Sequence, residues 1–134
     1  MKRTTVLLAV SILSVILVQY HPAETKTSRA SIARMWHGQT PAAKAEEYTA
    51  YLQEAGIKKI QSIPGNLGVQ MFRKNNQETT DFLVISYWDS FESIKKFAGE
   101  DYEKVYQMPR DPEFLIHPES KVQHYEVLLN DWSK

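Results

Sequence analysis

Apolar residues recur along this chain with two spacings, and the two spacings predict different elements. Apolar runs of strand type predict β-strands over residues 31–37, 68–73, 81–88 and 121–129. Gly38 is expected to stop the first strand, and Pro64-Gly65-Asn66 predicts a turn before the second. The polar stretch 75–78 predicts the loop of a hairpin between the second and third strands.

A helix is predicted between the first and second strands. Its apolar stripe consists of Ala45, Tyr48, Leu52 and Ala55. We expect Thr40 to cap its first turn, Pro41 to occupy the first helical position, and Gly56 to end it. After the third strand, Ser90 is expected to cap a helix that runs to about Ala98, with residues 100–107 extending it beyond Gly99.

The resulting element order is strand, helix, strand, strand, helix, strand, which predicts an α+β fold of the ferredoxin-like βαββαβ type. In this fold two helices cover one face of a four-stranded antiparallel sheet. The third strand is apolar on both faces, because Phe82, Val84 and Trp88 alternate with Leu83, Ile85 and Tyr87. A sheet with one wet face should alternate apolar and polar residues. We therefore expect a second copy of the chain to cover the helix-free face, which predicts a homodimer.

The N-terminal residues are of a different kind. Basic residues at positions 2 and 3 precede an almost wholly apolar stretch at 6–18, a pattern typical of an export signal. Three outcomes stay open: a cleaved signal peptide, an uncleaved membrane anchor, and a soluble N-terminus if the start of the chain was wrongly chosen. We accordingly assign residues 1–28 to leader and linker, 29–130 to one domain and 131–134 to a tail. The domain is expected in the periplasm or another extracytoplasmic space, with a membrane contact only through an uncleaved leader.

Composition excludes several functions. Sixteen acidic and sixteen basic residues balance, so no basic stripe for nucleic acid is expected. The chain has no cysteine, which excludes disulfides, thiolate metal sites and cysteine nucleophiles.

Four short stretches resemble a known family. They are IARMWHG at 32–38, PGNLG at 64–68, SYWDSFES at 86–93 and HYEV at 124–127. Over residues 31–129 the chain resembles the antibiotic-biosynthesis-monooxygenase-like (ABM) group of dimeric α+β barrel proteins. The resemblance implies a homodimer with a cavity beside each sheet. Some members of this family oxidise aromatic polyketides or quinols without a cofactor, some degrade haem, and many have no known activity. At the haem branch's working positions this chain holds Phe97 and Gln107, which leaves no axial His for iron.

Aromatic and cationic residues supply the candidate ligand site. Trp36 and Trp88 are expected to stack on an aromatic ligand, with packing in the core as the alternative. Arg34 shares strand parity with Trp36. It is expected either to pair with Glu126 or to bind an enolate or carboxylate of a ligand. Phe114 and the nearby His117 lie in a long Pro-rich stretch, which predicts a lid or a segment packed at the dimer seam.

Histidines supply the candidate catalytic groups. His124 and Glu126 lie two apart on a strand and therefore point the same way. Either His124 or His37 is a candidate base, because imidazole titrates near neutral pH. Together with His37 or His117, His124 and Glu126 could alternatively form a two-His, one-carboxylate metal site.

Three functions follow from these residues. The first is an exported dimer that binds a small aromatic or quinone-like molecule and oxygenates it with neither cofactor nor metal. In that scheme His124 or His37 takes a phenolic proton, the two tryptophans position the ring and Arg34 stabilises the anion. The second is a non-catalytic binding or stress-related module, and the third is a metal-dependent oxygenase.

Overall fold

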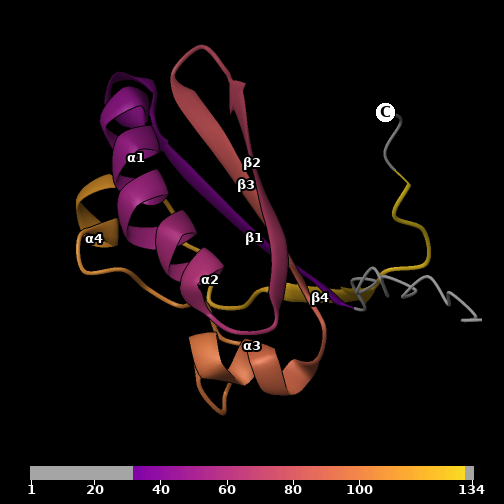
Figure 1. Ribbon diagram of the computed structural model, residues 1–134. Coiled ribbons are helices and arrows are strands. Elements are labelled where there is room, and N and C mark those ends of the chain that lie inside the picture. The colour runs from indigo at the N-terminus through magenta and orange to yellow at the C-terminus, as the bar shows by residue number, and fades with distance from the viewer. Residues whose placement is uncertain (1–31, 132–134) are drawn as a thin grey trace, which may run out of the picture.

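The computed structural model describes residues 32–131 (Figure 1). The predicted leader and linker over residues 1–28, and all of the predicted tail except its first residue, lie outside the described residues. Between residues 32 and 131, no helix is both long and apolar enough to cross a membrane.

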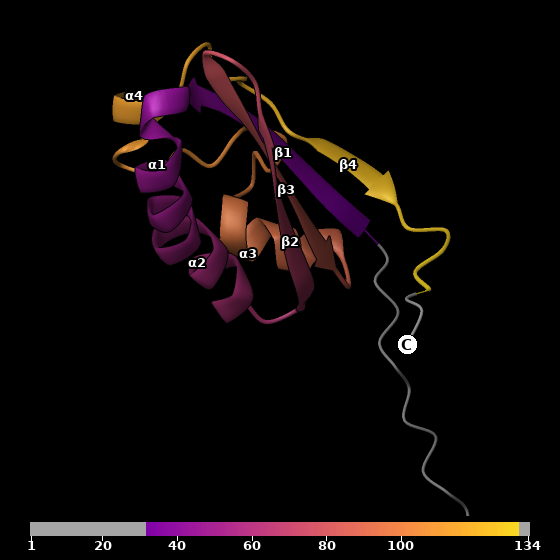
Figure 2. The ribbon, with the colours of Figure 1, turned by 90° about the horizontal axis from the view of Figure 1, so that it is seen from above.

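Four antiparallel strands form a single sheet in the order β2-β3-β1-β4. The strands are β1 (Ile32–Pro41), β2 (Asn66–Asn75), β3 (Thr79–Trp88) and β4 (Gln123–Glu126). Helices lie beside one face of this sheet (Figure 2). The predicted α+β, ferredoxin-like arrangement is confirmed.

The first helical stretch is longer than predicted. A 3₁₀ turn (Ala42–Lys44) leads into α1 (Ala45–Tyr51), a π-helical turn (Leu52–Ile57) and α2 (Lys58–Ser62). Gly56 does not end the helix, because the wider π turn absorbs it and the chain stays helical to Ser62. Thr40 does not cap the helix either, since it still belongs to β1 and its hydroxyl donates to the carbonyl of Pro41.

The second helix, α3 (Phe91–Ala98), begins and ends as predicted. Ser90 Oγ accepts a hydrogen bond from the backbone N–H of Ser93, and Gly99 follows the helix at φ 85°. The predicted extension over residues 100–107 is wrong. After Gly99 the chain turns away, and Lys104 forms an isolated antiparallel bridge with Lys121. A short helix, α4 (Asp111–Phe114), follows in the Pro-rich stretch.

The core lies between the sheet and the helices. From β3 it receives Phe82, Val84 and the fully buried Trp88, and the helices add Tyr48 and Ile94. On the opposite face of β3, side chains at 83, 85 and 87 are only half-buried. On that face Phe72 is 45% exposed and Tyr125 is 50% exposed. One chain therefore leaves an apolar face that no helix of the described residues covers.

β4 is shorter than the predicted strand over residues 121–129. It pairs with β1 only from Ile32 to Met35, so the chain beyond Glu126 has no strand partner among the described residues. Leu128 and Leu129 there are 82% and 79% exposed. Before Gln123 the chain leaves β1 and pairs with residues 103–105 instead. This departure opens a gap beside β1.

Candidate functional site

Two neighbouring cavities lie beside β1. The inner cavity, between sheet and helices, has a volume of about 50 Å³. Its polar wall residues are Arg34, Trp36, Ser86, Tyr106 and Asp111; its apolar ones are Leu52, Gly56, Ile57, Ile60, Val84, Phe97, Met108 and Val122. A water molecule needs about 10–15 Å³ by this measure. The inner cavity therefore has room for a few water-sized molecules or for one small polar group.

The outer cavity lies in the gap between β1 and the chain that leaves it. Its volume is about 300 Å³, in the range of small-molecule sites. It is lined by Trp36, His37, Lys104, Val105, Gln107, Asp111, Leu115, Pro118, Glu119 and Ser120. Trp36 and Asp111 line both cavities. The two cavities therefore adjoin at these two residues: the inner one is small and lined mainly by apolar side chains, and the outer one is larger and has more polar residues in its lining.

Arg34 is the cation of the inner cavity, and its side chain is buried. Its guanidinium donates to the backbone carbonyls of Tyr102 and Lys104, and Nη1 lies 3.0 Å from Nε2 of His124. Within residues 32–131, no carboxylate forms an ion pair with Arg34. Burial lowers the pKa of Arg34 to about 10, so the group stays charged at neutral pH.

The predicted Arg34–Glu126 pair is wrong. In the β1–β4 register Glu126 lies opposite Ile32, which precedes Arg34 by two residues, and the Glu126 side chain is exposed. His124 takes the position opposite Arg34 instead. A neutral ring and two backbone carbonyls thus replace the expected carboxylate, which leaves a positive charge inside the protein.

His124 is held as a neutral imidazole. A guanidinium can only donate, so Nε2 of His124 accepts and is unprotonated. Burial, and then the charge of Arg34, lower the pKa of His124. The rings of Phe91 and Tyr102 flank the imidazole edge-on, and His124 lines neither cavity.

Trp36 is the aromatic residue that the structure places in both cavities. Its indole lies across Gly38: a Cβ built on that glycine would be 2.4 Å from Cη2 of Trp36. Trp88, in contrast, is fully buried in the core. Its indole N–H donates to Ser86 Oγ at 2.8 Å, and its ring stacks on Phe97.

The remaining predicted residues lie apart from the inner cavity. His37 lines the outer cavity, where Nδ1 lies 3.1 Å from a carboxylate oxygen of Glu119. Phe114 is buried against the ring of Tyr48 and lines neither cavity. His117, at φ 48°, is exposed and also lines neither.

Asp111 is the site residue that the sequence did not single out. Its carboxylate is buried, with Oδ1 accepting from the Tyr48 hydroxyl at 3.1 Å and Oδ2 from the backbone N–H of Met108 at 2.8 Å. Burial raises the pKa of Asp111, although both hydrogen bonds act in the opposite direction. An Asp followed by Pro112 is a helix-start signal. That signal could have located α4, but not the burial of its first residue.

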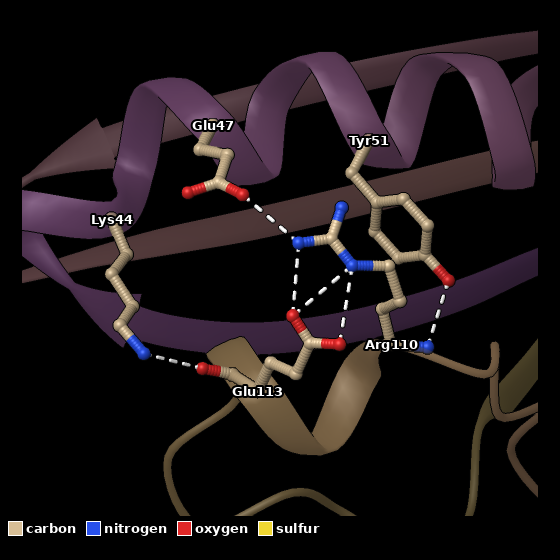
Figure 3. Close-up of polar contacts among 5 residues, drawn as sticks. All are labelled: Lys44, Glu47, Tyr51, Arg110 and Glu113. Atoms are coloured by element: carbon tan, nitrogen blue, oxygen red, sulfur yellow. Dashed lines mark hydrogen bonds and ion pairs between the residues drawn. The ribbon is translucent and has the colours of Figure 1, made fainter.

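A polar cluster fastens α4 to α1 (Figure 3). Arg110 Nη2 bonds carboxylate oxygens of Glu47 and Glu113 at 2.9 Å, and its guanidinium lies over the Tyr51 ring. The Tyr51 hydroxyl accepts from the backbone N–H of Arg110, while Lys44 Nζ donates to the carbonyl of Glu113. The cluster holds residues 110–113 in place, and Asp111 with them.

Comparison with known proteins identifies the family. The family model described as antibiotic biosynthesis monooxygenase matches residues 32–107. The chain belongs to the antibiotic biosynthesis monooxygenase (ABM) family. The match spans β1 to the residue before Met108, and so includes Arg34, Trp36 and Tyr106 of the inner cavity. No curated protein matches the chain.

Solved structures share the fold at low sequence identity. A Bacillus cereus protein provisionally identified as an antibiotic biosynthesis monooxygenase is 14% identical, with a TM-score of 0.53; the alignment covers 78% of this chain and all (100%) of that one. A Nitrosomonas europaea protein of unknown function is 11% identical, with a TM-score of 0.58, over 78% of this chain and 96% of that one. The haem degrader MhuD of Mycobacterium tuberculosis, with two haems in its active site, is 18% identical, with a TM-score of 0.51, over 75% and 99%.

The described residues do not assemble the metal site that the sequence left open. The inner cavity beside Arg34, at about 50 Å³, is by itself much smaller than a porphyrin. No three His, Asp or Glu side chains within residues 32–131 gather to hold a metal ion. The His124, Glu126 and second-His cluster of the metal hypothesis is therefore not assembled, because Nε2 of His124 faces Arg34 and Glu126 is exposed.

Proposed function

We propose that this ABM domain binds a small aromatic or quinone-like molecule as its anion and oxidises it with dioxygen without a resident cofactor. The observation that supports this proposal is Arg34, a buried cation that faces a largely apolar cavity and has no carboxylate partner among the described residues. An unpaired buried charge costs several kcal/mol. A ligand anion in the inner cavity would offset part of that cost, which favours an acidic ligand over a neutral one.

The sizes of the two cavities suggest how the ligand lies. A ring fits the outer cavity of about 300 Å³, where Trp36 supplies an aromatic face. Only a small group such as a phenolic oxygen fits the inner part of about 50 Å³. The ligand's oxygen would then point toward Arg34, with its ring outside, against Trp36.

This arrangement suits oxygenation of an electron-rich anion. When a phenol becomes a quinone, one atom of dioxygen enters the ring as a carbonyl oxygen. The other atom leaves as water with the two hydrogens that the ring and its hydroxyl lose. The protein's part is to hold the anion beside a fixed positive charge, which lowers the energy of the ionised form.

Oxygen uptake and binding, measured together, test the proposal. We would titrate the protein with a panel of naphthols and hydroxyquinones, follow tryptophan quenching, and record oxygen consumption. A charge-assisted hydrogen bond is worth about 1.5–3 kcal/mol, so Arg34→Gln should weaken binding by roughly tenfold or more. The matched control is Arg73→Gln, because Arg73 is an exposed cation already paired with Glu46 at 2.7 Å.

Three outcomes are distinguishable. Binding and oxygen uptake that both depend on Arg34 support the oxygenase. Binding without uptake shows the alternative, a non-catalytic binding module. Equal affinity in Arg34→Gln, Arg73→Gln and the native protein would contradict the proposal.

We further propose that the domain acts as a homodimer. The helix-free face of the sheet presents half-buried Ile85 at its centre, with Phe72 and Tyr125 exposed nearby. Packing this face against its counterpart in a second copy would remove it from water. Apolar burial contributes about 25 cal/mol per Å² before association costs.

We also propose that the protein is exported. The basic start and the apolar stretch at 6–18 favour an extracytoplasmic location. A fusion of residues 1–31 to a reporter enzyme that is active only after export tests it. An inactive reporter would contradict it.

A further inference from the structure

We infer that Asp111 is the group that takes the proton from the ligand's acidic hydroxyl. This inference rests on the proposed function and deepens it by assigning the base. It replaces the two histidines that the sequence favoured with a carboxylate on α4.

The first argument is position. Asp111 is the single carboxylate among the residues lining the inner cavity, and Arg34 is the single Lys or Arg there. Asp111 also lines the outer cavity, together with Trp36. A ligand that occupied both cavities would therefore lie beside Asp111.

The second argument is capacity. An ionised carboxylate has about four acceptor positions. Two are used, by the Tyr48 hydroxyl and by the backbone N–H of Met108. These two donors fix the orientation of Asp111 and leave further lone pairs for a ligand hydroxyl.

The third argument is the state of the two histidines. Nε2 of His124 already accepts from Arg34, so it could take a ligand proton only by giving up that bond. His124 also lines neither cavity. His37 lines only the outer cavity and lies beside Glu119 and Asp81 at an exposed position. Neither histidine has a free lone pair in the inner cavity.

The surroundings of Asp111 agree with this role. The titratable and charged groups around it are the Tyr48 hydroxyl from α1, Arg34 from β1, Tyr106 in the lining of the inner cavity, and His37, Lys104 and Glu119 in the lining of the outer one. Burial raises the pKa of Asp111. A raised pKa brings a carboxylate nearer to the range useful for a base at neutral pH.

The step itself is a proton transfer. The O–H bond of the ligand breaks, its electron pair stays on the ligand oxygen, and the proton bonds to a carboxylate oxygen of Asp111. The complex then holds a phenolate near Arg34 and a neutral carboxylic acid on Asp111. The total charge does not change, and no proton is exchanged with solvent.

This proton transfer within the complex can be measured with para-nitrophenol, whose ionised form has a visible absorption band. At a pH below the pKa of the free probe, the native protein should bind it with the phenolate band. Binding should release no protons, as judged by an enthalpy of binding that is independent of the buffer's ionisation enthalpy. In Asp111→Asn the complex should either lack the band or release about one proton per ligand, since an amide cannot take the proton.

The outcomes separate this inference from the proposed function. If the native protein does not bind the probe, or binds it without the band, both fail. If the band depends on Arg34 but Asp111→Asn shows the native band and the native proton count, only the role of Asp111 is overturned.

A second variant covers the case in which Asp111→Asn does not fold. Tyr48→Phe keeps the carboxylate but removes a hydrogen bond that lowers the pKa of Asp111. In the complex, Asp111 should therefore keep the proton that it took from the ligand up to a higher pH. An unchanged pH would overturn the assignment, because a purely structural Asp111 would not couple Tyr48 to the proton count.

Discussion

Arg34 and His124 lie opposite each other on β1 and β4, and 3.0 Å separates Nη1 of the arginine from Nε2 of the histidine. The arginine donates and the imidazole accepts, so the pair places a fixed positive charge beside a ring that must stay neutral. The same contact ties the edge strand to its neighbour.

The His124 contact predicts a pH dependence of stability. The folded state lowers the pKa of His124 below its ordinary value of about 6.5. As the pH falls below that value, the unfolded chain binds a proton that the folded chain does not, so the free energy of unfolding decreases. His124→Gln keeps an acceptor for Arg34 and removes the titration. Urea unfolding at neutral and mildly acidic pH should therefore show a smaller loss for His124→Gln than for the native protein. An equal loss would contradict the neutral imidazole.

Gly38 and Trp36 predict a steric effect on the site. An alanine Cβ at position 38 would approach the indole to 2.4 Å, closer than any real contact, so the indole must move. Gly38→Ala should change the tryptophan emission spectrum and weaken ligand binding. Gly68→Ala is the matched control, because a Cβ there meets nothing within 4 Å. If both variants bind the ligand equally well, the indole does not form part of the site.

Substitution should show that Trp88 contributes to stability and Trp36 to ligand binding. Trp88→Phe removes a hydrogen bond to Ser86 and buried volume from the core. It should lower the free energy of unfolding by about 1–3 kcal/mol and leave ligand affinity close to native. Trp36→Phe should weaken ligand binding and leave the free energy of unfolding close to that of the native protein. Denaturant titration and ligand titration on both variants provide the check. Loss of ligand affinity in Trp88→Phe would show that Trp88 is part of the binding site.

Arg110 predicts a link between α4 and the cavity. Arg110→Gln removes the guanidinium contacts to Glu47 (Figure 3) and to the Tyr51 ring, while the backbone N–H bond to the Tyr51 hydroxyl stays, and it should loosen residues 108–114. Amide hydrogen exchange should become faster in that stretch, and ligand affinity should fall because Asp111 is less well positioned. Arg73→Gln loses a comparable exposed pair with Glu46 away from the cavities. Identical exchange in the two variants would show that the cluster does not hold α4.

The helix-free face predicts the assembly state. Ile85 lies on that face between Met35 and Gln70 in the strand register. Ile85→Glu should convert a dimer into a monomer in sedimentation experiments, because a charge there cannot be buried without a partner. Gln53→Glu makes the same change of charge at an exposed position of the π turn and should stay dimeric. A native protein that sediments as a monomer would contradict the dimer.

Local signals in the sequence determined the fold. The apolar run of β3, the helical spacing of Tyr48 and Leu52, and the Ser90 cap are each local features of the sequence, and together they predict the βαββαβ order. The same signals placed Arg34 and Trp36 on one face of β1. They could not fix the π turn at Leu52–Ile57, because a glycine in a helix is a stop signal only if packing does not hold it.

Only the tertiary structure decided which groups meet. Asp111 is about eighty residues from Arg34 in the sequence, yet both line one cavity. The partner of Arg34 depended on where β4 leaves β1, since a shift of two residues exchanges Glu126 for His124. Periodicity reports which face a side chain occupies, but burial and long-range register determine its neighbours. For that reason the sequence by itself specified the scaffold, whereas the placement of a buried cation and a buried carboxylate in the lining of one cavity emerged only from the fold.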